Sequence, residues 1–380
     1  MSNQPVGPME HPVGPTVARQ VGEADGLRFD RLWDLALYEP GLGFYDTGGA
    51  AGRRADFLTS VELGPLFGAC VARRLDQAWD EAGRPDRWTL VDVGAGPGTL
   101  VRSVLAASPR CLPVLEAVMV ERTATQRAGH GQVIAWAGER GVEVRSQAEL
   151  PDRVDGLILA HELLDNLASR VVQRRGGDVQ ELWATPISAA DAEIAESSKG
   201  TIELSWRPLD ADDRRLLAGL EWWASVPDEA PVPWCVNAAP WVDEARRRLA
   251  SGTLVVVDYG TRTTAELARR DGWLRTYAEG AVGTDPLEEL GRRDLTCDVP
   301  FDQLPVPDRL ETQADALVGW GIDRLVAAAR ERLAQRSPGS MDLDWARDTS
   351  VLNEAPALVD PGGLGAFLVA EWTSGGGPDV

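Results

Sequence analysis

Apolar positions recur along the chain with two different spacings, and the change between them divides it into regions. Helical spacing covers residues 29–38, which end before Pro40, and residues 62–79, whose apolar side chains share one side of a helix. From residue 88 onward, short apolar runs typical of strands alternate with helical segments. The predicted strands cover 88–93, 115–120, 141–146 and 155–160, and a helix covers 99–107. This alternation is typical of a parallel sheet with helices on both faces.

The alternation of strands and helices is interrupted at residues 185–250. This segment is rich in Asp, Glu, Pro and Trp. We interpret it as an inserted cap whose tryptophans form a small core or an aromatic surface. A strand over 252–258, a helix over 314–336 and a closing strand over 364–372 then follow. The predicted fold class is α/β, a Rossmann-like, mostly parallel sheet with an N-terminal helical extension. The predicted domains are a mobile lead (1–25), the helical extension with a glycine-rich loop (26–87), the first part of the core (88–184), the inserted cap (185–250) and the completion of the core (251–380).

Composition narrows the class of protein. Of 380 residues, 44% are hydrophobic and 26% charged, which excludes wholesale disorder. The net charge of −21 argues against nucleic acid as a partner and favours basic ones. No apolar run approaches the roughly 18 residues of a membrane span, and no signal-peptide core is present, so we expect a cytoplasmic protein without a membrane partner. The four cysteines and three histidines are scattered, so no metal site is predicted.

A glycine turn follows the strand at 88–93 and opens the next helix. Asp92 precedes Gly94, Gly96 and Gly98, whose spacing is one residue shorter than the dinucleotide fingerprint. Glycines allow a tight turn and close approach of a ligand to the backbone. Glu121 ends the next strand, where a carboxylate accepts both hydroxyls of a ribose. This combination fits S-adenosylmethionine better than NAD; the alternative is that the two acids only cap a turn and line a loop.

Family-specific segments occur in order along the chain. They are ALYEPGLGFYDTGG (36–49), ADFLTSVELGPLFG (55–68), DVGAGPGTL (92–100), MVERTATQR (119–127), HELLDNLASRVVQ (161–173), GTLVVVDYG (252–260) and GRRDLTCDVPFDQL (291–304). Together they resemble the MidA family of class I methyltransferases, over about residues 29–375. The arginine-rich, lysine-poor composition favours a bacterial member. The resemblance implies S-adenosylmethionine as cofactor, S-adenosylhomocysteine as product and a protein arginine as acceptor, because mitochondrial members methylate arginine and assist respiratory complex I assembly.

An arginine acceptor requires carboxylates, since a guanidinium stays protonated and must be held and relieved of a proton. Glu162 and Asp165 follow the strand at 155–160, three residues apart, and His161 precedes them as a candidate proton acceptor. We interpret these three residues as catalytic. The alternative is that the acids cap the following helix and His161 packs against the sheet.

Further polar residues lie in segments that the resemblance connects with the site. Thr59 is a candidate cofactor contact, and the candidate substrate contacts are Asp56, Glu62, Asp258 and Tyr259. Thr59 and Glu62 fit a helix-capping box equally well. Gln313 lies in a family-like motif or is an exposed helix-start residue.

Two other functions stay open. The same fold serves small-molecule N- or O-methyltransferases. A scaffold that holds S-adenosylmethionine without transferring its methyl group is the third hypothesis. The sequence leaves the acceptor, the number of methyl groups and the oligomeric state undetermined.

Overall fold

The computed structural model describes residues 13–48, 59–187, 202–278, 281–336 and 341–374. The chain forms two compact units, each built from three separate segments. One unit comprises Met1–Gly49, Asn166–Ala238 and Thr263–Gln303. The other comprises Ala50–Asp165, Ala239–Arg262 and Leu304–Val380, and it contains the candidate site. We call them the antiparallel unit and the sheet unit.

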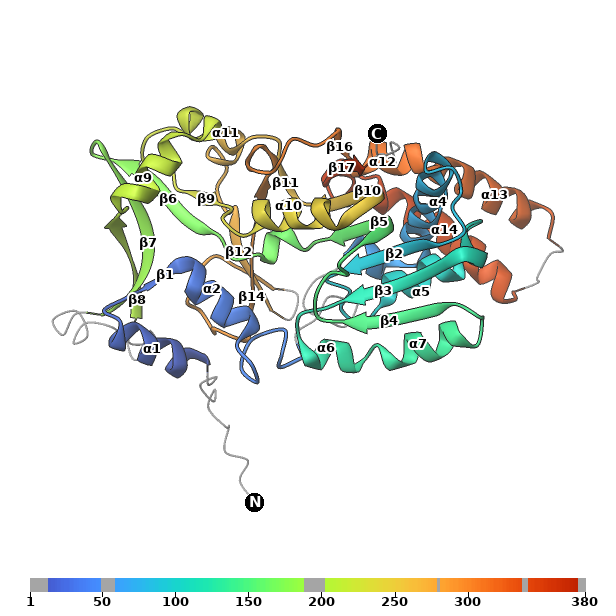
Figure 1. Ribbon diagram of the computed structural model, residues 1–380, viewed down its shortest axis with the longest axis horizontal. Coiled ribbons are helices and arrows are strands. Elements are labelled where there is room, and N and C mark those ends of the chain that lie inside the picture. Colours follow the sequence, from blue (N-terminus) through green and yellow to red (C-terminus); the bar gives the residue numbers. More distant parts are fainter. Residues whose placement is uncertain (1–12, 49–58, 188–201, 279–280, 337–340, 375–380) are drawn as a thin grey trace, which may run out of the picture. The chain divides into compact units, whose positions relative to one another are not determined.

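The sheet unit is built on a seven-stranded sheet, drawn in Figure 1. Its strands, in spatial order, are β16 (Arg309–Thr312), β17 (Leu368–Ser374), β10 (Leu249–Asp258), β5 (Val154–His161), β2 (Trp88–Val93), β3 (Leu115–Val120) and β4 (Glu143–Gln147). The five strands from β10 to β4 are parallel, and β17 and β16 are antiparallel to their neighbours. The predicted α/β, mostly parallel fold is therefore confirmed.

Helices connect and cover these strands (Figure 1). They are α3 (Ser60–Leu63), α4 (Pro65–Glu81), α5 (Thr99–Ala106), α6 (Ala124–Ala128), α7 (Gly131–Gly138), α10 (Ala238–Arg248), α12 (Gln313–Trp320), α13 (Ile322–Ala334) and α14 (Leu343–Leu358), with 3₁₀ turns η1 (Leu112–Val114), η2 (Leu164–Asn166) and η5 (Leu364–Ala366). Alternate strand residues such as Leu90 and Leu157 join one core with α4, α5 and α7. Val91 and Ile158, on the opposite face, are also fully buried. Burial on both faces explains why the central strands are continuous apolar runs.

The antiparallel unit has a sheet of order β1-β7-β6-β9, with β8 paired to β7. Its strands are β1 (Leu27–Arg28), β6 (Arg170–Arg175), β7 (Asp178–Pro186), β8 (Ile202–Pro208) and β9 (Val232–Trp234); a second sheet holds β12 (Leu274–Ala278), β13 (Ala281–Gly283) and β14 (Asp294–Cys297). Its helices are α1 (Val13–Glu23), α2 (Phe29–Tyr38), α9 (Ala211–Ala218) and α11 (Thr264–Leu267), with 3₁₀ turns η3 (Glu221–Ser225) and η4 (Phe301–Gln303). A two-residue strand, β15 (Val299–Pro300), also belongs to this unit, whereas the two-residue strand β11 (Gly260–Thr261) belongs to the sheet unit. Trp222, Trp223 and Trp234 are buried, as expected of a small core.

The division into units differs from the predicted one. The hairpin of β6 and β7 begins before the expected cap, and it pairs with β1, β8 and β9 instead of with the seven-stranded sheet. Residues 263–303 likewise join the antiparallel unit, although they were assigned to the completion of the core. Residues 13–23 of the expected mobile lead form α1, because Val17 and Val21 lie one turn apart and are fully buried.

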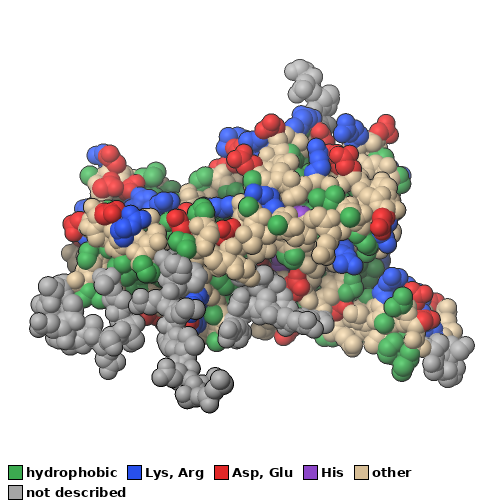
Figure 2. Space-filling view, turned by 90° about the horizontal axis from the view of Figure 1, so that it is seen from below, with side chains coloured by type: hydrophobic (Ala, Val, Ile, Leu, Met, Phe, Trp, Pro, Cys, Tyr) green, Lys and Arg blue, Asp and Glu red, His purple; other side chains and the backbone are tan. Residues whose placement is uncertain are grey.

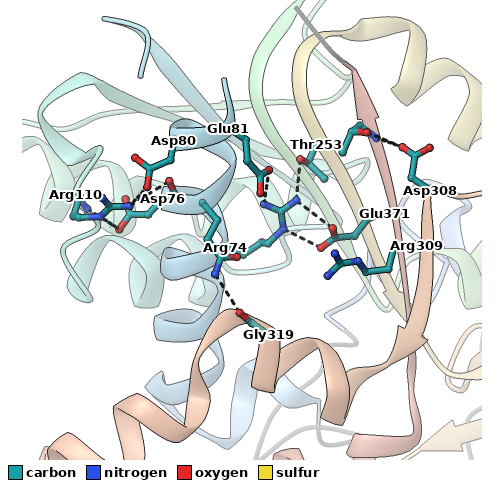
Figure 3. Close-up of polar contacts among 12 residues, drawn as sticks. Arg74, Asp76, Asp80, Glu81, Arg110, Thr253, Asp308, Arg309, Gly319 and Glu371 are labelled. Carbon is teal, nitrogen blue, oxygen red and sulfur yellow. Dashed lines mark hydrogen bonds and ion pairs between the residues drawn. The ribbon is translucent and has the colours of Figure 1, made fainter. Parts of the chain in front are cut away.

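A buried ion pair links α4 to strand β17 within the sheet unit (Figure 3). The guanidinium of Arg74 donates to both oxygens of Glu371, from Nε at 2.9 Å and from Nη2 at 3.1 Å. Nη2 also donates to Thr253 Oγ1 at 3.1 Å, and Glu81 lies 3.4 Å from Nη1. The side chains of Arg74 and Glu371 are each 6% exposed. Opposite charges shielded from water interact strongly. Removing either side chain would leave the other charge buried without a counter-charge, which destabilises the fold.

Among the helices of the described residues, none is both long enough and apolar enough to span a membrane.

Candidate functional site

The glycine turn lies at the carboxyl end of β2 and opens α5. Gly94, Gly96 and Gly98 all have positive φ angles, of 72°, 50° and 82°. A Cβ added to Gly98 would lie 2.6 Å from the sulfur of Met119, so this end of the turn is packed against β3. A Cβ added to Gly96 would have no described atom within 4 Å. The turn is therefore packed at its end and open at its middle, where a ligand can approach the backbone.

Glu121 lies at the end of β3, beside this opening. Its Oε2 accepts from the Gly96 N–H at 3.2 Å, and its Oε1 accepts from the Thr123 N–H at 3.1 Å. The side chain is held in one orientation by these two backbone donors. The Thr123 hydroxyl also donates to Oε1, at 3.5 Å. Since a carboxylate has about four acceptor positions, Glu121 still has capacity to accept from a hydroxyl of a ligand.

Asp92 is the last residue but one of β2 and is almost completely buried. Its Oδ2 has no hydrogen-bond partner among the described residues. Burial and, as a smaller cause, the nearby charge of Glu121 together raise the pKa of Asp92 to about 7. An unpaired buried carboxyl beside an open turn fits a ligand that brings a positive charge or a hydrogen-bond donor.

This raised pKa predicts how stability depends on pH. The folded protein keeps a proton on Asp92 that the unfolded chain releases, so the free energy of unfolding falls as pH rises from about 4 to about 7 and stays lower above it. We expect Asp92→Asn to increase the free energy of unfolding at pH 8 by up to about 4 kcal/mol and to change it little at pH 4. Urea unfolding at the two pH values measures the difference. The exposed Asp86→Asn is the control, and an equal effect of Asp92→Asn at both pH values would contradict the assignment.

Three carboxyl groups gather at the carboxyl ends of β5 and β10. Asp258 is fully buried, and its Oδ2 accepts from the N–H groups of Leu164 at 2.9 Å and Asp165 at 3.3 Å. Asp165 in turn accepts from the hydroxyl of Tyr259. The Glu162 N–H donates to the carbonyl of Val257 at 2.8 Å. The predicted residues Glu162, Asp165, Asp258 and Tyr259 are thus brought together within one unit.

The carboxyl cluster adjoins the glycine turn through Leu163. A Cβ added to Gly94 would lie 3.1 Å from Leu163 Cδ1. Glu162, immediately before Leu163, has a φ of +51°, which is rare for a residue other than glycine. Such a backbone costs about 1–3 kcal/mol and is retained where the surrounding structure fixes it. The neighbouring bonds to Asp258 supply that constraint.

Burial shifts the pKa of Asp258 and the pKa of His161 in opposite directions, and each shift favours the neutral form of the side chain. Burial raises the pKa of Asp258 well above its ordinary value, and the charges of Asp165 and then Glu162 add to this rise. Burial lowers the pKa of His161 to about 3, so its imidazole is neutral at physiological pH. The ring packs edge-on against Phe67 at a centroid distance of 4.9 Å, and its Nε2 lies 3.5 Å from Glu162 Oε1. This packing favours the structural alternative for His161 over a role as a proton acceptor.

The remaining candidates have mixed surroundings. Asp56 lies outside the described residues. Thr59 is buried at the N-cap of α3, but its side chain makes no capping bond, so the capping box with the half-buried Glu62 does not form. Gln313 is fully buried, contrary to the exposed alternative: its Oε1 accepts from Ser60 Oγ at 3.1 Å and its Nε2 donates to the Leu358 carbonyl at 3.1 Å.

Two groups of residues were not identified from the sequence. His130 contacts the glycine turn, although it lies in a segment without a recognisable motif. In the antiparallel unit, Tyr45 donates to Asn166 at 2.8 Å and to Asp294 at 3.2 Å, and Asn166 donates to Asp294 at 3.1 Å. These last three residues come from three separate segments of the family resemblance, and only that coincidence could have suggested their contact.

Comparison with known proteins identifies relatives of this chain. Curated relatives include the protein arginine methyltransferase NDUFAF7 homolog of Drosophila melanogaster, 26% identical over 295 residues, and NDUFAF7 of Homo sapiens, 23% identical over 330 residues. The matches cover 70% and 78% of this chain, and 62% and 69% of the two relatives. The chain thus spans somewhat over three fifths of the first of these mitochondrial proteins.

Two crystal structures from Burkholderia thailandensis share the fold. The first, bound to S-adenosyl-homocysteine, has a TM-score of 0.79 at 24% identity, and the second a TM-score of 0.78 at 23% identity. Each match covers 98% of this chain and 95% of the other. A family model for S-adenosyl-L-methionine-dependent methyltransferases, Methyltransf_28, matches residues 70–318, about two thirds of the sequence. This chain therefore belongs to that methyltransferase family.

Proposed function

We propose that the chain transfers the methyl group of S-adenosylmethionine to the guanidinium of a protein arginine. The observation that carries this proposal is the open glycine turn, bordered by Glu121, next to the carboxyl cluster formed by Glu162, Asp165 and Asp258. Relatives named as protein arginine methyltransferases support the choice of acceptor.

The residues around the turn fit the cofactor. We assign the ribose hydroxyls to Glu121, whose carboxylate is already oriented by two backbone donors. We assign the positive end of the ligand to Asp92, whose buried Oδ2 has no partner among the described residues, and the adenosyl group to the open middle of the turn at Gly96. S-adenosylmethionine supplies a methyl carbon made electrophilic by the adjoining sulfonium. Thr59 remains a predicted further contact.

The carboxyl cluster fits a cationic acceptor. A guanidinium keeps its proton in water, so its nitrogen lone pair is available only where carboxylates localise the charge and accept a proton. Glu162 and Asp165 are assigned this role, with Asp258 fixing the backbone at residues 164 and 165. Tyr259 orients Asp165 through its hydroxyl.

The face drawn in Figure 2 gives no further guide to the acceptor. Figure 2 shows acidic and basic side chains intermixed on the face it draws. The preference for a basic protein segment therefore rests on the buried carboxyls and not on a single-sign surface. Small-molecule methylation and a non-catalytic scaffold remain the alternative functions, and the cytoplasmic location remains a prediction from the sequence.

Cofactor binding is the first test. We expect calorimetric titration to show micromolar affinity for S-adenosylhomocysteine and none for NAD. Glu121→Ala should weaken that affinity by about 10- to 100-fold, because each hydrogen bond to a charged group contributes about 1.5–3 kcal/mol. Glu116→Ala is the matched control: Glu116 lies on the same strand, away from the turn, and pairs with Arg145. Equal affinities for wild type and Glu121→Ala would contradict the assignment.

The acceptor requires a second assay. We expect transfer of labelled methyl to arginine-containing peptides and not to the same peptides with lysine. Transfer only to small amines or alcohols would favour the small-molecule alternative. Tight cofactor binding with no transfer to any acceptor would favour the scaffold.

A further inference from the structure

His130 is a fully buried side chain that the proposed function does not use. It lies between α6 and α7, within the sheet unit. Its Nε2 is 2.6 Å from the carbonyl oxygen of Gly96, and its Nδ1 is 2.7 Å from Ser146 Oγ. The imidazole thus bridges the glycine turn and the strand β4.

The partners determine the arrangement of hydrogens on this ring. A carbonyl oxygen can only accept, so Nε2 carries a hydrogen and donates it to Gly96. In the neutral ring Nδ1 is then the acceptor, and the hydroxyl of Ser146 donates to it. The Gly96 carbonyl therefore fixes the hydrogen on Nε2, and the Ser146 hydroxyl, which can donate or accept, provides the partner of Nδ1.

Gly96 is the residue of the turn that most needs an external constraint. It has no side chain, and an added Cβ there would have no described atom within 4 Å. The following residue is Pro97, so the peptide between them has no N–H and offers only its carbonyl for anchoring. His130 binds that carbonyl on one side of Gly96, while Glu121 accepts from the Gly96 N–H on the other.

We propose that His130 is a positioning residue for cofactor binding, which acts by holding the Gly96 carbonyl. With that carbonyl fixed, the Gly96 N–H points at Glu121 and keeps its carboxylate directed at the ligand. Without it, the glycine rotates among its many allowed conformations, and Glu121 loses one of its two backbone donors. This inference rests on the proposed function, since the ligand concerned is the adenosyl cofactor.

A pair of amide variants separates the two contacts of the ring. The amide nitrogen of His130→Gln reaches about as far as Nε2 and keeps a donor for Gly96. The shorter His130→Asn reaches only about as far as Nδ1, so it keeps a partner for Ser146 and loses Gly96. We expect His130→Asn to weaken S-adenosylhomocysteine binding by about 10-fold or more and His130→Gln by less than about threefold, as for the loss or retention of one buried hydrogen bond.

Kinetics supply a readout that a merely structural role would not move. For His130→Asn, the KM for S-adenosylmethionine should rise by the same factor as the dissociation constant, with kcat changed by less than about threefold. Val369→Ala, a fully buried core position in β17, is the control for general destabilisation. Its melting temperature should fall while its affinity stays that of the wild type.

The outcomes are distinguishable. If the wild type fails to bind S-adenosylhomocysteine, the proposed function fails and this inference is overturned with it. If the wild type binds and both amide variants bind equally well, or weaken equally, the Gly96 contact does not position the cofactor and only this inference is overturned. A kcat that falls while KM is unchanged would also overturn it. Selective weakening by His130→Asn supports it.

Discussion

Glu162→Gln is expected to lower the rate of methyl transfer by about 10²- to 10⁴-fold at saturating acceptor, the range for losing a charged group that acts in the transition state. The substitution keeps the shape of the side chain and removes its negative charge. A guanidinium would then lose one of the carboxylates that localise its charge. Glu162 also lies on an unusual backbone, at φ +51°, which fixes the direction of its side chain. Single-turnover assays with an arginine peptide measure the effect.

The same variant should bind S-adenosylhomocysteine as the wild type does, because Glu162 does not border the glycine turn directly. Glu139→Gln, at the exposed C-terminus of α7, is the matched control and should leave both binding and rate unchanged. A wild-type rate for Glu162→Gln would remove this residue from the proposed chemistry. If cellular function also survived while a disrupted glycine turn abolished it, the scaffold alternative would gain support.

The largest effect on stability is expected from Glu371→Ala, which should lower the free energy of unfolding by about 3–5 kcal/mol. The substitution leaves the guanidinium of Arg74 buried with its main counter-charge removed (Figure 3). Glu81 cannot replace that charge, because its side chain is 63% exposed and contacts Arg74 only at 3.4 Å. Urea unfolding of the purified protein measures the change.

Replacing both Arg74 and Glu371 should lower the free energy of unfolding far less than replacing Glu371 alone. We expect the double variant Arg74→Met, Glu371→Leu to recover most of the lost stability, since no buried charge is then left without a partner. Arg153→Ala, which breaks an exposed pair with Asp155, should change stability by less than about 1 kcal/mol. A loss of less than about 1 kcal/mol for Glu371→Ala, or no recovery in the double variant, would show that the pair is unimportant.

The local elements were predictable where one side-chain pattern determined them. The predicted ranges 29–38, 88–93 and 115–120 coincide with α2, β2 and β3. Their apolar residues are buried, so burial and pattern agree. Two predicted helices are each divided in two by a glycine in the structure. The predicted helix over residues 62–79 is divided at Gly64, and the predicted helix over residues 314–336 is divided at Gly321, which has a φ of +93°.

Other features depend on contacts that local sequence does not reveal. The start of α4 is stabilised by Glu354, which accepts from the Leu66 N–H at 2.8 Å across 288 residues. The helix that carries Glu354, α14, was not predicted, and its internal Pro356 is a residue that normally argues against a helix. Tertiary packing overrode that local preference.

The sequence indicated which residues belong to the candidate site, but not which of them form hydrogen bonds with one another. Asp92, the three glycines and Glu121 follow from one motif and the strand after it. The bonds from residues 164 and 165 to Asp258 join positions more than 90 residues apart, so no spacing rule could indicate them. The burial that lowers the pKa of His161 is likewise a property of the packed sheet.

The order of strands in the seven-stranded sheet has a consequence for biosynthesis. Strand β10 has one neighbour, β5, from the preceding part of the chain, but its other neighbour, β17, begins about 110 residues after β10 ends. At ribosomal rates of about 5–20 residues per second, roughly 5–20 s separate the completion of β10 from the appearance of β17. During that interval the nascent chain exposes an unpaired apolar strand edge, which favours association with other chains. Correct folding of this protein in a crowded cell is therefore expected to depend on chaperones that bind the growing chain until β17 emerges.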